Sequence, residues 1–269
     1  MNNLTDFSPD SLNRLISVWI NRYCEKYNIK TLVVGISGGI DSSLITRLCE
    51  RTFRKMICVS MPMWNQPIAE STKRAIELIE LSKQTHSRIR FEIKQIGTIV
   101  QEYQKNGLAN TQLSEGNLRA RIRANILYDY AGENSGIVVG TGNKDEDTIG
   151  YFTKGGDGLV DLCPLSNIHK SNVYKMAELL NVPKSILEVK PTAELWEGQT
   201  DEGELGMNYD EVEWAIKMLD VLKSIDKNQQ NLITNYFSER EKIVLDNVKY
   251  MIKKNAHKTK YPPIFPEEF

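Results

Sequence analysis

The stretch TLVVGISGGIDSS, residues 31–43, contains the pattern that decides the fold. Its first part, Thr31 to Ile36, is a short run of β-branched and apolar residues, which is typical of a buried strand. Serines and two adjacent glycines follow, and the spacing of apolar residues over 41–53 predicts a helix directly after them. The stretch therefore predicts a strand, a tight loop and a helix in immediate succession.

The same alternation continues along the chain. Apolar runs at Met56 to Met61 and at Ile89 to Ile96 predict two more strands, with a helical pattern over 69–83 between them. A fourth strand is expected at Ile137 to Val139. Strands separated by helices of this length run parallel through right-handed crossovers. The sequence therefore predicts an α/β fold, a doubly wound parallel sheet with flanking helices.

Further helical patterns surround these strands. Ser8-Pro9 is typical of a helix start, and the apolar spacing from Leu12 to Tyr23 predicts an amphipathic first helix. Other helices are expected near residues 114–131, 170–181, 209–222 and 236–255. Because no repeat or low-complexity linker interrupts the chain, we expect one domain over residues 1–269.

Composition excludes several classes of protein. The chain has 269 residues, 41% of them apolar, and 34 basic against 35 acidic side chains give a formal net charge of −1. A protein that binds long nucleic acid through its phosphates usually carries a surplus of Lys and Arg. No run of 18 apolar residues occurs. We expect a cytoplasmic protein with small-molecule substrates and neither a nucleic-acid nor a membrane partner.

The four cysteines form no C-x-x-C pair, so neither a zinc ribbon nor a thioredoxin-type centre is indicated. Buried, reduced thiols are expected at Cys24, Cys49, Cys58 and Cys163.

The loop after the first strand is suited to bind phosphate. In Ser37-Gly38-Gly39-Ile40-Asp41-Ser42 the glycines let backbone N–H groups approach an anion, the serine hydroxyls add donors, and the helix N-terminus adds positive partial charge. A bare Gly-Gly pair would favour an ordinary capped turn instead. Because the chain has no Gly-Lys dipeptide and no G-x-G-x-x-G motif, the loop is neither a Walker loop nor a dinucleotide fingerprint.

This loop resembles the pyrophosphate loop of the N-type ATP pyrophosphatases, which split ATP between the α and β phosphates. Further blocks match the ammonia-dependent NAD synthetases of that superfamily in content and order, over residues from about 8 to about 260. The blocks are 116–123, 140–146, 152–158, 161–165, 190–195, 201–206 and His257-Lys258. The resemblance implies a fold like that of the adenine nucleotide α-hydrolases.

The same resemblance implies a reaction. Nicotinic acid adenine dinucleotide (deamido-NAD) would be adenylated by ATP at its carboxylate and then amidated by ammonia to NAD, with release of AMP and pyrophosphate. ATP and Mg²⁺ are the implied cofactors. Since 269 residues leave no room for the amidase domain of glutamine-dependent members, free ammonia is the expected donor, and a separate glutaminase stays an alternative. A homodimer is expected by analogy.

Site residues follow from the matching blocks. Asp41 and Glu146 are the implied catalytic and Mg²⁺-binding pair, because Mg²⁺ takes one or two carboxylates together with phosphate oxygens. A helix cap and a solvated loop acid are their respective alternatives. Residues implied to bind ATP are Gly35, Ile36, Ser37, Gly38, Gly39, Ile40, Asp41, Ser42, Thr141, Lys170 and Thr192. Residues implied to bind deamido-NAD are Arg121, Lys154, Asp161, His257 and Lys258.

Two of these residues have support from the pattern itself. Lys170 opens an expected helix, where a cation opposes the macrodipole, so we expect an anion nearby. Arg121 lies at the edge of the apolar stripe of its helix, where an arginine needs an anionic partner. Arg119 and Arg123 fall away from that stripe and are expected to be solvated.

Two segments keep alternative interpretations. The acidic segment Glu197 to Glu211 has the composition of a hydrated loop and a helix start, whereas the resemblance implies a cover near the active site. Pro62-Met63-Trp64 stands where many family members have Pro-x-Gly, which leaves the adenine contacts open. Trp64 is either a base-stacking residue or a core or interface tryptophan.

Alternative functions also remain. The chain could be another amide-forming or thio-forming superfamily member acting on a different acid, although a tRNA thiolase is disfavoured by the missing C-x-x-C and the missing basic surplus. It could also be a non-catalytic adenine-nucleotide sensor on the same fold. Asp41 and Glu146 disfavour a sensor, because a sensor has little need for a metal at the pyrophosphate.

Overall fold

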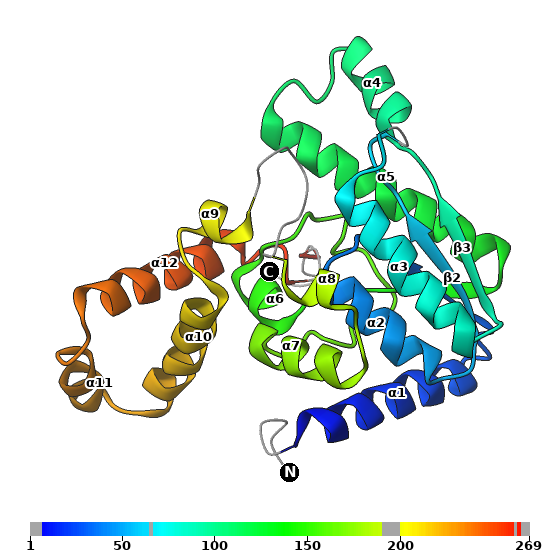
Figure 1. Cartoon of the computed structure of the whole chain (residues 1–269). Helices are drawn as coiled ribbons and strands as arrows, with labels where there is room; N and C mark the ends of the chain where they lie inside the picture. Colours follow the sequence, from blue (N-terminus) through cyan, green and yellow to red (C-terminus); the bar gives the residue numbers. More distant parts are fainter. Residues whose placement is uncertain (1–6, 65–66, 190–199, 261–262, 265–269) are drawn as a thin grey trace.

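A parallel sheet forms the centre of the molecule. The computed structural model describes residues 7–64, 67–189, 200–260 and 263–264. The sheet has four strands in the order β3-β2-β1-β4 (Figure 1). They are β1 (Thr31–Gly35), β2 (Lys55–Ser60), β3 (Ile89–Ile93) and β4 (Gly136–Val139). All pairs are parallel, and the order reverses beside β1, so the predicted doubly wound sheet is confirmed.

Helices connect the strands and extend the chain beyond them. Those of the first two thirds are α1 (Pro9–Lys26), α2 (Ile40–Glu50), α3 (Glu70–Thr85), α4 (Gly97–Lys105), α5 (Gln112–Glu133), α6 (Lys144–Ile149), α7 (Lys170–Leu179) and α8 (Lys184–Leu187). Those of the C-terminal part are α9 (Asp201–Leu205), α10 (Tyr209–Ser224), α11 (Lys227–Thr234) and α12 (Glu239–Asn255).

The two faces of the sheet have separate apolar clusters. Leu32 and Val34 of β1 pack with side chains of α1, α2, α3 and α7. Val33, which points to the other face, packs with side chains of α4 and α5. A strand covered on both faces needs apolar residues at successive positions, which explains the unbroken apolar run of β1.

A third apolar cluster lies away from the sheet, between α10 and α12. Figure 1 shows these helices projecting to one side of the sheet. Ile149 of α6 is a buried member of this cluster. Because α6 also carries Glu146, the C-terminal helices are packed against an element of the expected site.

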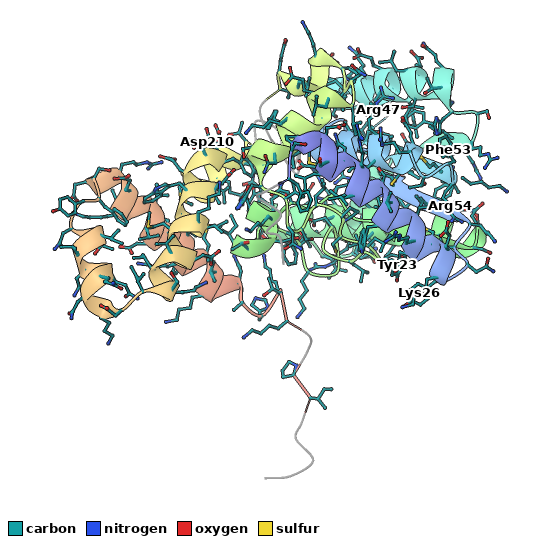
Figure 2. All side chains as sticks on the ribbon, turned by 90° about the horizontal axis from the view of Figure 1, so that it is seen from below. Tyr23, Lys26, Arg47, Phe53, Arg54 and Asp210 are labelled. Atoms are coloured by element: carbon teal, nitrogen blue, oxygen red, sulfur yellow. The ribbon has the colours of Figure 1, made fainter. Side chains whose placement is uncertain are left out.

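The residue before β2, Arg54, connects the N-terminal end of the sheet to α1 and to the segment that follows it. Arg54 donates to Asn21 Oδ1 at 3.0 Å and to the Ile29 carbonyl at 3.1 Å. Figure 2 shows Phe53 and Arg54 together with Tyr23 and Lys26 near the end of α1. The loop that is predicted to bind phosphate is at the opposite, C-terminal end of β1, where ligands bind in sheets of this kind.

Several element boundaries differ from the prediction. The third strand ends at Ile93 rather than Ile96, since a short helix begins at Gly97. The helix expected over 236–255 begins at Glu239, because Ser238 caps it through the Glu241 backbone N–H. Short helices such as α6 and α9 were not predicted, since they have too few turns to show an apolar period.

Two predictions about single side chains are wrong. Cys163 is exposed, whereas Cys24, Cys49 and Cys58 are buried as expected. Arg119 and Arg123 are half-buried rather than solvated: Arg119 pairs with Glu115, and Arg123 Nε donates to the Met61 carbonyl at 3.1 Å. Arginines can reach across an apolar surface to a buried acceptor, which the helical spacing does not reveal.

None of the described helices is both long and apolar enough to cross a membrane.

Candidate active site

The loop between β1 and α2 is held by its own serines. Ser37 Oγ lies 3.1 Å from Ser42 Oγ and accepts from the Gly39 N–H at 3.1 Å. Ser43 Oγ donates to the Gly39 carbonyl at 2.8 Å. These contacts hold Gly35 to Ser42 in one conformation at the N-terminus of α2, where the helix dipole favours an anion.

Gly38 is required by the position of the neighbouring helix α3. Its φ is +81°, and a Cβ at this residue would lie 2.1 Å from the Ser71 carbonyl oxygen. Arg74 of α3 also donates from Nε to the Gly38 carbonyl at 3.0 Å. Arg74 therefore places a guanidinium at the loop, which the sequence reasoning missed.

Asp41, Glu146 and Lys170 meet beside this loop. Lys170 Nζ lies 2.5 Å from Asp41 Oδ2 and 3.5 Å from Glu146 Oε1. The Lys170 side chain is 3% exposed, against 17% and 18% for the two carboxylates. The anion expected near Lys170 is thus present, in the form of the two predicted metal-binding side chains.

Helices α9 and α10 add polar groups to this cluster. Tyr209 Oη lies 3.0 Å from Glu146 Oε1 and 2.9 Å from Asp201 Oδ2, and the Lys170 ammonium lies 4.7 Å from its ring centre. A phenol has one proton to share between the two carboxylates. Asp201 lies in the segment expected to be a cover, so the described part of that segment contacts the site.

Burial perturbs the ionisation of this cluster. Burial raises the pKa of Glu146 to about 8, with Lys170 opposing and Asp41 and Asp201 adding to the rise. Burial alone would lower the pKa of Lys170, but Asp41 and Glu146 outweigh it and raise that pKa. The lysine therefore stays charged at neutral pH. Perturbed groups of this kind gather at functional sites.

The charge balance fits a divalent cation. Asp41, Glu146 and Asp201 surround the ammonium of Lys170, so carboxylates outnumber the cation of this group. Carboxylate oxygens beside a phosphate-binding loop are the ligands that Mg²⁺ prefers. The residues present therefore fit the implied Mg²⁺.

A second buried group, Asp145, His169 and Glu213, also has metal-ligating side chains close together. Most of its polar atoms already have partners, although the buried His169 Nε2 has no hydrogen-bond partner among the described residues. Asp145 accepts from the Lys170 backbone N–H and contacts His169 Nδ1, and Glu213 pairs with Lys217.

Asn143 holds the two predicted catalytic acids. It is fully buried, its Nδ2 donates to Asp41 Oδ1 at 3.1 Å, and its Oδ1 accepts from the Glu146 backbone N–H at 3.2 Å. The capping-box pattern, a cap residue followed three positions later by Glu or Gln, is visible in the sequence and could have identified Asn143.

Four residues expected at the dinucleotide are connected in the structure. Arg121 Nε donates to the Lys154 carbonyl, and Lys154 Nζ donates to the His257 carbonyl, both at 3.3 Å. Lys258 Nζ donates to the carbonyls of Gly150 and Phe152 at 2.8 Å each. Arg121 is exposed, and the partner described for it is a carbonyl rather than an anion.

The remaining expected residues are placed differently. Asp161 Oδ2 accepts from the Val138 N–H at 2.7 Å, so this carboxylate is occupied with the backbone of β4. Thr141 lies just after β4 and is half-buried. Thr192 lies outside the described residues. Trp64 is 40% exposed and packs near Gly97, not in the core.

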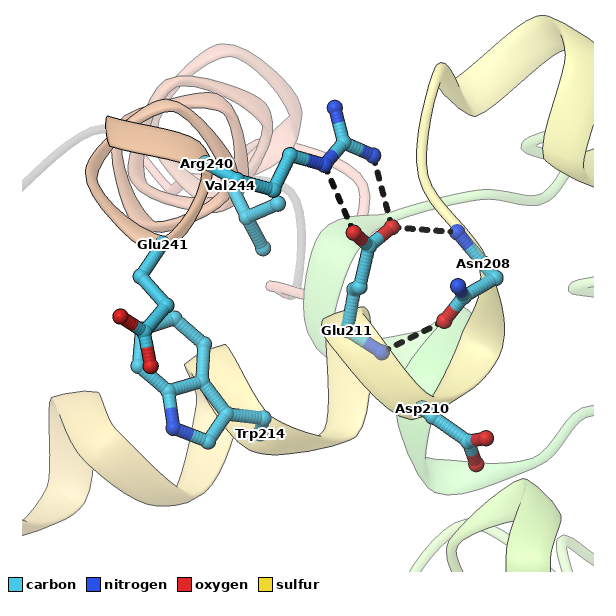
Figure 3. A pocket seen from close by; sticks show the side chains of 7 residues that line it. All are labelled: Asn208, Asp210, Glu211, Trp214, Arg240, Glu241 and Val244. Carbon is cyan, nitrogen blue, oxygen red and sulfur yellow. Dashed lines mark hydrogen bonds and ion pairs between the residues drawn. The ribbon is translucent and has the colours of Figure 1, made fainter. Parts of the chain in front are cut away.

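A pocket between α10 and α12 has a different character. It has a volume of about 250 Å³ and is lined by Asn208, Asp210, Glu211, Trp214, Arg240, Glu241 and Val244. Figure 3 shows the guanidinium of Arg240 paired with Glu211, which is itself part of the cap of α10. The catalytic candidates do not line it.

Known proteins resemble the chain over nearly its whole length. The sequence model of the NAD synthase family matches residues 12–262. The NH(3)-dependent NAD(+) synthetase of Pyrococcus furiosus is 38% identical over 237 residues, which is 86% of each chain.

Two solved structures have the same fold. NMN synthetase from Francisella tularensis has a TM-score of 0.79 and 30% identity, covering 97% of this chain and 99% of that one. NH3-dependent NAD synthetase from Campylobacter jejuni has a TM-score of 0.78 and 25% identity, covering 97% and 100%. The match of the family model over most of the chain, together with the similar relative and the shared fold, shows that this chain belongs to the NAD synthase family.

Proposed function

We propose that the chain amidates deamido-NAD to NAD with ammonia, at the expense of ATP. The observation that carries this is the meeting of Lys170, Asp41 and Glu146 at the phosphate-binding loop of an NAD synthase family member. The nicotinate carboxylate attacks the α phosphorus and pyrophosphate leaves. Ammonia then attacks the adenylated carbonyl, AMP leaves with the bonding electron pair, and the nitrogen releases one proton to solvent.

In this proposal residues 35–42 hold the phosphates of ATP through backbone N–H groups and the Ser37 and Ser42 hydroxyls. Asp41 and Glu146 would hold Mg²⁺, which when bound would supply positive charge for the departing pyrophosphate. Lys170 donates to a phosphate oxygen as a point charge. Support comes from the low exposure of the ammonium, which keeps its attraction for phosphate from being screened by water.

Thr141 and Thr192 complete the proposed ATP contacts. Arg121, Lys154, His257 and Lys258 are proposed to hold the dinucleotide. Their support is the chain of hydrogen bonds that connects α5, the segment after α6 and the end of α12. Asp161 is proposed to contribute through the lone pairs that remain on its carboxylate beside its bonds to Val138 and Tyr128.

Location and assembly are further proposals. By resemblance we infer a single domain, a homodimer in the cytoplasm, and free ammonia as the donor, with a separate glutaminase as an alternative source. The balanced net charge of −1 supports small-molecule rather than nucleic-acid substrates.

A second acid substrate needs testing, because the Francisella structure is of an NMN synthetase. Nicotinic acid mononucleotide is the corresponding acid. It carries the same carboxylate and one phosphate but no adenosine.

The experiment incubates the protein with ATP, Mg²⁺, an ammonium salt and either acid, and identifies all products. NAD, AMP and pyrophosphate in equal amounts are expected with deamido-NAD. A higher kcat/KM for the mononucleotide than for deamido-NAD would show that the mononucleotide is the preferred acid substrate. ADP and phosphate as products would contradict the adenylation mechanism, and ATP turnover without either acid would contradict amidation.

A further inference from the structure

We propose that Asp145 is a positioning residue that fixes the Lys170 ammonium against Glu146 and Asp41. This rests on the function proposed above for those three residues. Asp145 itself is fully buried and lies next to Glu146 in α6.

One carboxylate joins the first turns of two helices. Asp145 is the second residue of α6, and its Oδ2 accepts from the Lys170 backbone N–H, the first of α7, at 2.7 Å. Helix α7 has no side-chain cap of its own, since His169 at its N-cap makes no such bond. Asp145 therefore caps α7 from a different helix, where a carboxylate also complements the dipole.

The imidazole of His169 fixes this carboxylate in turn. Its Nδ1 lies 2.6 Å from Asp145 Oδ1, so both carboxylate oxygens have partners at the start of α7, one at its N-cap residue and one at its first residue. His169 is 4% exposed and can rotate little in such a packed place. The orientation of Asp145 relative to α7 is thus set by two contacts rather than one.

The consequence concerns the lysine side chain. Lysine has a flexible four-carbon stem, so the place of its ammonium depends on where its backbone is held. Asp145 holds that backbone against α6, and the next residue of α6, Glu146, lies 3.5 Å from the ammonium. The bond from Asp145 to the Lys170 N–H therefore holds the start of the lysine stem beside Glu146, while Asp41 pairs with the ammonium at its far end.

The same cluster could be considered as a cation site with Glu213, but its bonds favour positioning. Asp145 uses both oxygens toward α7, and Glu213 Oε1 pairs with Lys217 at 2.5 Å. A cation would have to compete with these contacts.

The experiment measures the dissociation constant of MgATP by calorimetry, which needs no turnover, well below the thermal midpoint of each variant. Asp145→Ala removes both acceptors and should weaken MgATP binding roughly 10- to 100-fold, as loss of groups that orient metal ligands does. Asp145→Asn keeps one acceptor and should have a smaller effect in the same direction. If Asp145→Ala does not fold, Asp145→Asn carries the measurement.

The matched control is Glu50→Gln. Glu50 is likewise a buried carboxylate, paired with Arg47 at 3.1 Å, but it lies at the far end of α2. The Glu50→Gln variant should have a lower thermal midpoint and an MgATP affinity within twofold of the wild type. A purely structural role for Asp145 predicts the same behaviour, so lowered midpoints with unchanged affinity in both Asp145 variants would overturn the proposal.

A double-mutant cycle tests whether Asp145 acts through Lys170. In a Lys170→Met background, Asp145→Ala should change MgATP affinity by less than about twofold, because there is no ammonium left to position. An undiminished effect would overturn the proposed route. Unchanged MgATP affinity in Lys170→Met alone would instead contradict the proposed role of Lys170, and absence of NAD as a product would contradict the proposed function.

Discussion

Two ion pairs of ordinary chemistry lie in very different surroundings in this molecule. Lys170 and Asp41 meet at the edge of the sheet with side chains 3% and 17% exposed. Arg240 and Glu211 meet beside the pocket of Figure 3 with side chains 53% and 24% exposed. Water screens the attraction in the second pair much more than in the first, so two close ion pairs have unequal consequences.

The difference also concerns charge balance. The Arg240 pair is one cation against one carboxylate, and it fastens the start of α10 to α12. Lys170 faces several carboxylates, an arrangement that costs desolvation energy and gives little stability by itself. This buried cluster has more carboxylates than cations, and it lies beside the loop that is proposed to bind phosphate. Binding of ligands explains such an excess of buried negative charge better than the stability of the fold does.

The largest effect is expected for Lys170→Met. Removing the ammonium leaves buried carboxylates without compensation, so the free energy of unfolding should fall by about 3–5 kcal/mol. The rate of NAD formation should fall at least 100-fold, since the loss of a preorganised charge costs about 3 kcal/mol of barrier. Urea unfolding and steady-state kinetics measure both.

The control for this variant is Lys175→Met, which removes an exposed lysine of the same helix. It should leave both quantities near the wild-type values. A stable and active Lys170→Met protein would show that the buried ion pair matters no more to stability and activity than the exposed one.

The next effect concerns Asp41→Ala and Glu146→Ala. Each should lower kcat more than it raises KM, because the proposed metal contacts stabilise the transition state more than the bound substrate. We expect a loss of at least ~3 kcal/mol of barrier stabilisation for each. Glu178→Ala, at an exposed acid of α7, is the matched control, and near-normal turnover in either test variant would exclude that residue from the mechanism.

Sequence and structure agree best where local pattern and chemistry coincide. The four strands, their parallel orientation and the tight loop between β1 and α2 were predictable because apolar runs and glycines act locally. Asn143 could have been found from its capping pattern. Asp201 and Tyr209 could not, because their contacts with Glu146 depend on how α9 and α10 return to the sheet.

Charged residues show the limit of helical spacing. Arg123 was expected in solvent from its place on its helix, yet it reaches the Met61 carbonyl. Whether a long or short polar side chain finds a backbone partner is decided by tertiary packing. No periodicity within one helix contains that information.

The pH dependence of stability gives a sharper test of the buried cluster. The pKa of Glu146 is raised from 4.5 to about 8, so the folded protein binds this proton more tightly than the unfolded chain. This tighter proton binding stabilises the folded state fully below pH 4.5, and the stabilisation is lost as the pH rises through about 8. Without Mg²⁺, the wild type should therefore lose stability between pH 5 and 9 more steeply than Glu146→Gln. Parallel stability curves would show that Glu146 ionises normally.

A smaller effect is expected at the C-terminal end of α12. Lys258→Met removes two bonds to the carbonyls of Gly150 and Phe152, together with the cation that is proposed to hold the dinucleotide. A charge-assisted bond from this ammonium to the substrate would be worth about 1.5–3 kcal/mol. The KM for the dinucleotide should rise roughly tenfold or more, with MgATP affinity nearly unchanged. Lys253→Met, at an exposed lysine of α12, is the control. An unchanged KM would make Lys258 a structural residue or a dispensable one, and the thermal midpoint separates these.

The smallest effect is expected for Arg240→Ala, at the exposed ion pair. Bulk water already solvates both groups, and ordering two long side chains costs entropy, so removing the arginine should barely change the thermal midpoint and should not change kcat or KM. Any residual shift should vanish in 1 M salt, where the Debye length is only about 3 Å. The thermal midpoints of Arg240→Ala and Lys170→Met are to be measured in low salt and in high salt. The salt dependence of the two midpoints then compares the two ion pairs directly. If the shift of the midpoint in Arg240→Ala persists in high salt, Arg240 stabilises α10 through its hydrogen bond to the Gly206 carbonyl rather than through its charge. The two ion pairs would then differ less than their exposure implies.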